Sequence, residues 1–145
     1  MKESVVHLQG NTSDLIIQTQ PVVEILYWGE KISGVEAAAI QAIKRAVPNG
    51  RLDVDTPVTI SPEHGRGIFS SPGMEGNRQG LDWSPVFGFK AIQQNGNHLL
   101  ITSEDQIAGL KLVCELKLDS QNDVLQVRNT LTNLKSATYQ VDRLA

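Results

Sequence analysis

The residues that could hold a metal ion are few and lie far apart. His7, His64 and His98 fall in separate parts of the chain, and the single cysteine, Cys114, lies within an apolar stretch. Protein zinc sites use histidine and cysteine ligands at short, regular spacings such as C-x2-C or H-x3-H, and neither spacing occurs here. The sequence therefore predicts no metal site and no cofactor.

Nucleophiles and paired carboxylates are only weakly indicated. Ser70 and Ser71 lie close to glycines, but they lack the G-x-S-x-G spacing of a nucleophile elbow. Asp53 and Asp55 alternate along an expected edge strand, where a solvated face explains them more simply than glycosidic acid–base catalysis. Asp82 is a single acid within a loop. The residues by themselves therefore predict no catalytic residue in this chain.

Residues suited to binding are concentrated in one stretch, residues 61–85. It contains five of the twelve glycines and three of the six prolines, and it shows neither the helical nor the strand period. Apolar residues alternate with the glycines, so we predict an ordered loop that presents Arg66, Arg78 and Trp83. An aromatic face stacks on a pyranose, and guanidinium groups donate hydrogen bonds to its hydroxyls. The alternative is that Trp83 and Phe69 only pin the loop to the rest of the domain.

Composition indicates one ordinary globular domain. The chain has 145 residues, 40% of them hydrophobic and 20% charged, with a net charge of −3. There is no basic stripe, so neither nucleic acid nor a membrane surface is expected as a partner. No apolar run is long enough to span a bilayer, and the N-terminus has no signal-peptide core. A single cysteine fits a reducing compartment, so we expect a cytoplasmic location.

The elements expected to hold the loop are mostly short β-strands. The residues at 110–118 alternate between apolar and charged, Asn95 and Gly96 form a strong hairpin signal, and Leu125, Val127 and Leu131 are expected to point inward. Residues 5–29 are predicted to be strands, most clearly over 13–18 and 22–28. Further strands are predicted over 87–93, 98–103, 110–118, 125–132 and 139–141, with an edge strand over 54–60.

One helix is expected before the loop. Ser33 and Glu36 have the spacing of a capping box, and the alanine-rich run 34–47 that follows is ended by Pro48. Short antiparallel strands, some apolar on one face only, favour two packed sheets. The predicted fold is therefore mainly β, an antiparallel two-layer sandwich with one short helix.

Three stretches together resemble the microbial α-galactosidases of glycoside hydrolase family 36. They are HLQGNTSDLII followed by LYWGEKI, the glycine-rich stretch 61–85, and the ending VRNTLTNLKSATYQVDRLA. The resemblance covers nearly the whole chain in order. It implies that residues 1–145 form a single N-terminal domain, a galactose-mutarotase-like β-supersandwich. It also implies that the catalytic barrel, with the aspartates of a retaining mechanism, belongs to a longer enzyme.

The resemblance also implies roles for loop residues. In the family this loop approaches the sugar site, sometimes across a subunit interface. Many members have Gly-Asp-Phe-Arg where this chain has GIFS at 67–70, so the acidic and basic contacts of that motif are absent unless Arg66 or Arg78 replaces them. The expected substrate-proximal residues are Arg66, Phe69, Arg78 and Trp83, and the expected loop-shaping residues are Gly65, Gly67 and Pro72.

Three hypotheses follow for the function. The leading one is a non-catalytic N-terminal domain of a retaining α-galactosidase for melibiose- or raffinose-type sugars, inactive alone, that shapes the substrate pocket and subunit contacts. Its expected partners are its own C-terminal barrel, the α-galactoside and further copies of the enzyme. The alternative is a stand-alone carbohydrate-binding module. A small mutarotase-like enzyme is disfavoured, because it needs a positioned acid and base and the histidines are scattered.

Overall fold

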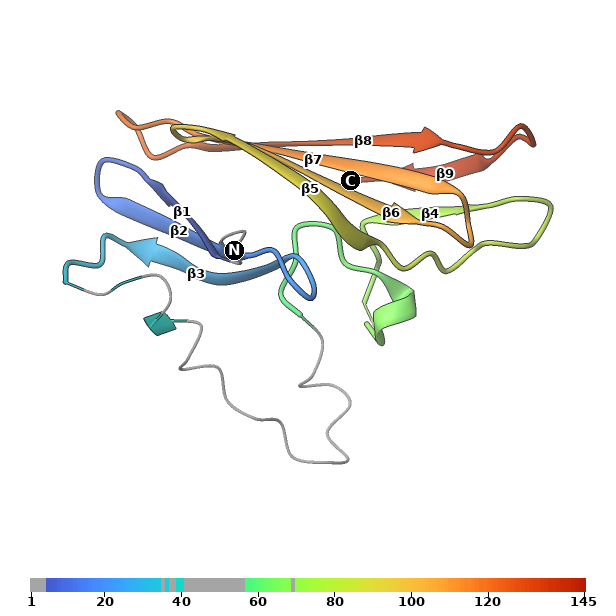
Figure 1. Ribbon diagram of the computed structural model, residues 1–145, viewed down its shortest axis with the longest axis horizontal. Helices are drawn as coiled ribbons and strands as arrows, with labels where there is room; N and C mark the ends of the chain where they lie inside the picture. The colour runs from blue at the N-terminus through green and yellow to red at the C-terminus, as the bar shows by residue number, and fades with distance from the viewer. Residues whose placement is uncertain (1–4, 35, 37–38, 41–56, 69) are drawn as a thin grey trace, which may run out of the picture.

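The computed structural model describes residues 5–34, 36, 39–40, 57–68 and 70–145. That part of the chain is mainly antiparallel β-sheet, so the predicted fold class is confirmed (Figure 1). The sheets have the strand orders β1-β2-β3, β4-β9 and β5-β6-β7-β8. The elements are β1 (Val5–Gln9), β2 (Ser13–Gln18), β3 (Glu24–Glu30), the 3-10 turn η1 (His64–Arg66), β4 (Met74–Asn77), β5 (Gly88–Asn95), β6 (His98–Asp105), β7 (Leu110–Leu118), β8 (Leu125–Asn133) and β9 (Gln140–Leu144).

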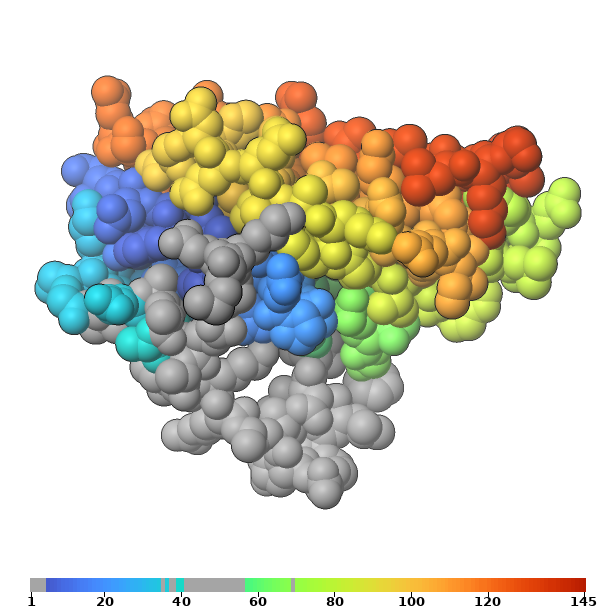
Figure 2. All heavy atoms as spheres, viewed as in Figure 1, coloured from blue at the N-terminus to red at the C-terminus, as the bar shows by residue number. Residues whose placement is uncertain are grey.

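Two apolar clusters lie between the layers. The sheet β5–β8 forms one layer, and the other layer is divided between β1–β3 at one end and β4–β9 at the other (Figures 1 and 2). The five residues of β7 that are predicted to face inward are all buried. The first cluster comprises Val6, Leu8, Leu15, Ile17, Leu99, Ile101, Cys114, Leu116 and Leu118, and the second Met74, Phe87, Ala108, Leu110, Leu112 and Tyr139.

The predicted strands agree well with the observed ones, with one omission. β2 and β7 have the predicted bounds, and β3, β5, β6, β8 and β9 differ only at their ends. β4 lies inside the stretch predicted to be a loop and pairs with β9. Gly76 in β4 has no side chain to pack, and a Cβ there would collide with the Gln140 carbonyl oxygen. This strand forms because of its partner, so its own residues do not show it.

Two predicted elements fall largely outside the described residues. These are the helix over 34–47 and the first part of the edge strand over 54–60. The described part of the latter, residues 57–60, is not a strand, although the Val58 carbonyl accepts a hydrogen bond of 2.7 Å from Ile25 N. In the part of the chain that the structure covers, no helix is long and apolar enough to cross a membrane.

A carboxylate joins the β1–β2 turn to the β7–β8 turn. Asp123 accepts hydrogen bonds from Asn11 N at 2.6 Å, from Thr12 Oγ1 at 2.8 Å and from Ser13 Oγ at 2.8 Å. Gly10 permits this approach, because a Cβ at Gly10 would collide with the carboxylate. Desolvation acts to raise the pKa of Asp123, but the hydrogen bonds outweigh it and lower the pKa to about 2.

This carboxylate predicts a defined pH dependence of stability. Because the folded pKa lies below the ordinary value of 3.8, ionised Asp123 stabilises the fold above pH 3.8, and this contribution is lost as the pH falls to about 2. We expect Asp123→Asn to lower the free energy of unfolding at neutral pH, with a difference from the parent chain that narrows between these two pH values. Urea unfolding at several pH values measures it, and a constant difference down to pH 2 would contradict the assignment.

Candidate functional site

The predicted loop is held at the β4–β9 end of the sandwich by a largely buried carboxylate. Glu63 Oε2 accepts hydrogen bonds from Arg66 Nε at 2.9 Å and from Phe87 N at 3.1 Å. Arg66 Nη2 in turn donates to the Phe87 carbonyl at 2.6 Å. Burial raises the pKa of Glu63 above its ordinary value, against the lowering effect of the Arg66 guanidinium. The Arg66 guanidinium is therefore engaged within the domain.

The backbone around η1 explains the two loop-shaping glycines. Gly67 ends η1 with a φ of 85°, a left-handed conformation that glycine adopts without strain. A Cβ at Gly65 would collide with Val86 Cγ2. Pro72 is buried, and Phe69 lies outside the described residues. A larger residue at Gly65 or a non-glycine residue at Gly67 would thus strain the local backbone, whereas for Pro72 the loop-shaping role stays a prediction.

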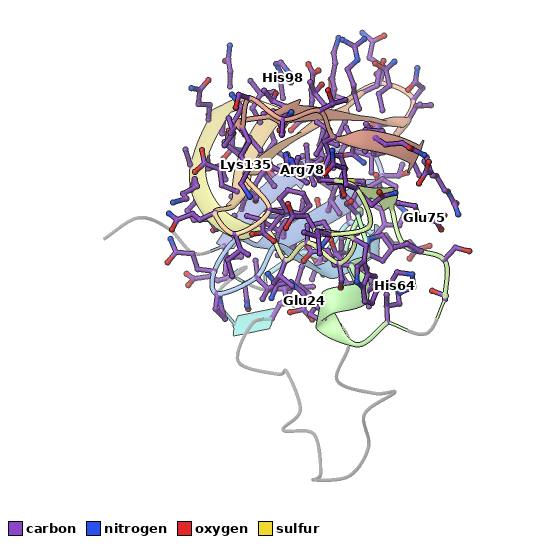
Figure 3. All side chains as sticks on the ribbon, turned by 90° about the vertical axis from the view of Figure 1, so that its right-hand side faces the viewer. Glu24, His64, Glu75, Arg78, His98 and Lys135 are labelled. Atoms are coloured by element: carbon purple, nitrogen blue, oxygen red, sulfur yellow. The ribbon has the colours of Figure 1, made fainter. Side chains whose placement is uncertain are left out.

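Arg78, labelled in Figure 3, is the centre of a second set of contacts. Its Nη1 lies 2.8 Å from Asp82 Oδ2 and 3.0 Å from the Ala108 carbonyl oxygen, and its Nη2 lies 2.7 Å from Asn133 Oδ1. Its guanidinium carbon lies 5.4 Å from the centre of the Tyr139 ring. Only 11% of the Arg78 side chain is exposed. One cation therefore joins the loops at 78–83, 105–109 and 133–139.

The turn beyond Arg78 has a conformation that the sequence did not reveal. Arg78 and Leu81 exchange two backbone hydrogen bonds, and the residues between them, Gln79 and Gly80, have φ values of 53° and 81°. Positive φ at both central positions is the geometry of a type I′ hairpin turn. Glycine suits the second position, whereas glutamine at the first gave no hairpin signal.

Asp82 connects this turn to the following residues. It accepts from Arg78 and lies 3.5 Å from Lys135 Nζ, and its own carbonyl accepts a 3.0 Å hydrogen bond from the Tyr139 hydroxyl. Its φ of 55° lies in the left-handed region, which aspartate tolerates better than most residues. These contacts fix the backbone directly before Trp83.

Four apolar side chains are exposed on the loops that Arg78 joins. Trp83 is 63% exposed and Ile107 is 85% exposed. Exposed apolar patches of this kind often mark interaction sites. We call the set the loop-end surface; its members are Leu81, Trp83, Ile107 and Leu134.

The hollows next to Glu63 are too small for a sugar. One, of about 10 Å³, is lined by residues that include His64, Trp83 and Phe87. A second, of about 30 Å³, extends between the layers to Ile101 and Cys114. A single water molecule needs about 10–15 Å³ measured in this way. Neither hollow could enclose a monosaccharide.

The other candidate chemical groups do not converge. His7 lies 3.1 Å from Asp14 in one sheet, His98 lies 2.7 Å from Glu115 in another, and His64 is on η1. The described residues contain no cluster of His, Cys, Asp and Glu suited to a metal ion. Burial raises the pKa of Cys114 to about 11, so its thiol is unreactive at neutral pH. Asp53 and Asp55 lie outside the described residues, and Ser70 and Ser71 are exposed.

The residues that sequence analysis missed act by positioning others. Asp105 accepts hydrogen bonds from Val86 N at 2.7 Å and from Ile107 N at 2.8 Å, so it joins the loop to the β6–β7 turn. An aspartate that begins a turn and accepts from the amide two residues later is an Asx-turn, and this was the available signal. Glu63 and Tyr139 gave no such signal, because their partners are distant in the sequence.

Comparisons with known proteins agree with this architecture. The family model described as the glycosyl hydrolase family 36 N-terminal domain matches residues 22–145. The chain is 46% identical over 138 residues to an α-galactosidase of Escherichia coli, covering 95% of this chain and 19% of that protein. It thus spans about one fifth of the length of that relative.

Solved structures show the same fold at low sequence identity. The galactosidase domain of the α-galactosidase–sucrose kinase AgaSK has a TM-score of 0.82 at 15% identity, covering 99% of this chain and 24% of that one. An α-galactosidase of Lactobacillus brevis has a TM-score of 0.76 at 18% identity, covering 97% and 23%. A family 36 enzyme of Geobacillus stearothermophilus in complex with raffinose has a TM-score of 0.75 at 15% identity, covering 97% and 23%.

The contacts of Arg78 predict a large effect on stability. We expect Arg78→Ala to lower the free energy of unfolding by about 3 kcal/mol, because the largely buried Asp82 carboxylate and the buried Ala108 carbonyl lose their donor. Arg78→Lys should lose less, since the charge remains but the forked donor geometry does not. Chemical denaturation followed by circular dichroism measures both.

Arg128 provides the matched control. Its side chain is 78% exposed and lies 3.9 Å from Glu115, so Arg128→Ala should change the free energy of unfolding by less than about 0.5 kcal/mol. Equal effects of Arg78→Ala and Arg128→Ala would show that Arg78 does not hold the loops together.

Proposed function

This chain belongs to the glycosyl hydrolase family 36 N-terminal domain family, and from this we propose that it forms one side of the substrate pocket in a retaining α-galactosidase. The bond-breaking carboxylates would lie in the remaining four fifths of the enzyme, which this chain does not cover. The substrate would be a terminal α-galactoside of the melibiose or raffinose type. In support, one structural neighbour was solved with raffinose bound.

The observation that carries the proposal is the exposure of Trp83. A tryptophan that is 63% exposed on a rigid loop offers a flat apolar face, the surface on which a pyranose ring stacks. The adjacent hollows are too small to enclose a sugar. The loop-end surface therefore needs an opposing surface, which the catalytic part or another subunit would supply.

Arg66 and Arg78 have a different role in this proposal. Each guanidinium is bound within the domain, Arg66 to Glu63 and Phe87, and Arg78 to Asp82 and Asn133. A guanidinium already bound in this way has few donors left for sugar hydroxyls. We assign both arginines to positioning of the loop, with Trp83 facing the substrate.

A second candidate function rests on a different observation. An open groove of about 430 Å³ is lined by Gln20, Pro21, Gly88, Phe89 and Lys90. It is wide open to solvent, and its two candidate contact groups are the exposed Lys90 side chain and Phe89, whose ring also packs against the first cluster. This groove favours a stand-alone carbohydrate-binding module. Calorimetry with galactose and raffinose separates the two functions, because a module binds sugar without a catalytic part.

A hybrid enzyme tests the leading proposal. Replacing the matched segment of the E. coli α-galactosidase with this chain should give an enzyme that hydrolyses raffinose, whereas the 145-residue chain alone should not hydrolyse nitrophenyl α-galactoside. In the hybrid, we expect Trp83→Ala to lower kcat/KM for raffinose about tenfold, because a stacking contact is lost.

Trp28 provides the control for this substitution. It is also exposed, at 47%, but it lies on β3 in the sheet β1-β2-β3 and not on the loop that carries Trp83. Trp28→Ala in the hybrid should therefore leave kcat/KM unchanged. Equal activity of Trp83→Ala and the parent hybrid would remove Trp83 from the site. Turnover that copurifies with the isolated chain would overturn the non-catalytic assignment.

A further inference from the structure

The inner face of β8 is incompletely covered. Val127 pairs with Leu116 in the β7–β8 register, and residues paired across antiparallel strands point to the same side of the sheet. Leu116 is fully buried, whereas Val127 is 44% exposed. The prediction that Val127 faces inward is therefore confirmed, but no part of the described chain covers its side chain fully. A gap lies beneath β8 at Val127.

β9 ends at the border of this gap. It pairs with β4 along one edge, and all five of its residues are exposed. Among the described strands none pairs with its other edge. The Ala145 carbonyl, directly after β9, accepts a 2.6 Å hydrogen bond from Asn129 Nδ2. Asn129 lies two residues from Val127, on the same face of β8.

The direction of β9 leads into the gap. Tyr139, just before β9, packs in the cluster at the β4–β9 end, and Leu125, at the start of β8, packs against the cluster under β1–β3. From Tyr139 to Ala145 the chain thus runs along β8 toward Leu125, and β9 points that way in Figure 1. An extended chain advances about 3.3 Å per residue, so two or three more residues would reach Val127.

Asn129 has an unmet hydrogen-bond requirement at the same place. Its Oδ1 is buried and has no partner, although its Nδ2 donates to Ala145. Buried acceptors in folded proteins nearly always have a donor. The amide of Asn129, through its Nδ2, thus marks the point where the end of β9 meets the inner face of β8. The exposed Val127 side chain and the unpaired edge of β9 together favour an extended polypeptide with apolar side chains as the cover of this gap.

We propose that the residues which follow Ala145 in the complete enzyme prolong β9 beneath β8 and cover Val127. This inference rests on the proposed function, under which the chain is the first part of a longer α-galactosidase. In the relatives that the chain matches, more than three quarters of the length lies outside the matched part. The added segment alternates apolar and polar residues, with the apolar ones facing Val127 and Leu125.

Thiol labelling tests the proposal directly. Val127→Cys and Val124→Cys are matched, since Val124 is 51% exposed but lies outside β8. In the 145-residue chain the introduced thiols at both positions should react readily with a soluble disulfide reagent, while the buried Cys114 thiol should not react. We then append to Ala145 the twenty residues that follow the matched segment in the E. coli α-galactosidase. Labelling at Val127→Cys should slow at least tenfold, and labelling at Val124→Cys should not change.

Hydrogen exchange on the unsubstituted chains provides the second measurement. Exchange over residues 125–131 and 140–145 should slow at least tenfold in the extended chain. Unchanged labelling and exchange, or equal slowing at Val124→Cys, would overturn the proposal. Protection that appears in the 145-residue chain only at high concentration would do so too, because a second copy would then cover the gap. Raffinose hydrolysis by the hybrid tests the proposed function separately. Failure of that function and failure of the proposed cover beneath β8 can therefore be distinguished.

Discussion

The guanidinium of Arg78 is the interaction on which the loop end of this domain depends. Taking a cation out of water is costly unless opposite charge and hydrogen-bond acceptors replace the lost hydration. Asp82, Asn133 and the Ala108 carbonyl supply that replacement, and the Tyr139 ring lies against the guanidinium. Because these acceptors come from three loops, satisfying one buried cation fixes all three loops relative to one another. The exposed apolar residues of the loop-end surface thus belong to a single, preorganised surface.

The division of the second layer explains why the functional features lie where they do. The sheet β5–β8 is continuous, whereas its cover consists of β1–β3 at one end and β4–β9 at the other. Each part buries its own apolar cluster. The two features proposed to bind other groups therefore lie at the end of the sandwich and at the border between the β1–β3 and β4–β9 sheets. The loop-end surface is an example of the first, and the gap beneath Val127 is an example of the second.

Family membership and the geometry of the loop end are two independent lines of evidence about this domain. The fold persists in solved α-galactosidases at 15–18% identity, which shows how weakly individual side chains constrain this sandwich. The described residues bring together buried ion pairs and positioned turns, and these are typical of a scaffold that holds a surface. Trp83 is the exception, because it is large, aromatic and exposed on a backbone that its neighbours fix. This distribution is the one expected under the proposed function.

The sequence by itself determined the strands whose side chains alternate, the β5–β6 hairpin at Asn95 and Gly96, and hence the antiparallel sandwich. These features depend on local periodicity and on turn residues, which each segment carries alone. The tertiary structure alone decided that Arg66 and Arg78 bind inward, that residues 74–77 form a strand, and that Val127 stays partly uncovered. Each of these outcomes depends on partners distant in the chain, such as Phe87 for Arg66, Asn133 for Arg78 and β9 for β4. The residue type determines which hydrogen bonds and contacts a side chain can form. Which partner lies close enough to form them depends on the folded chain.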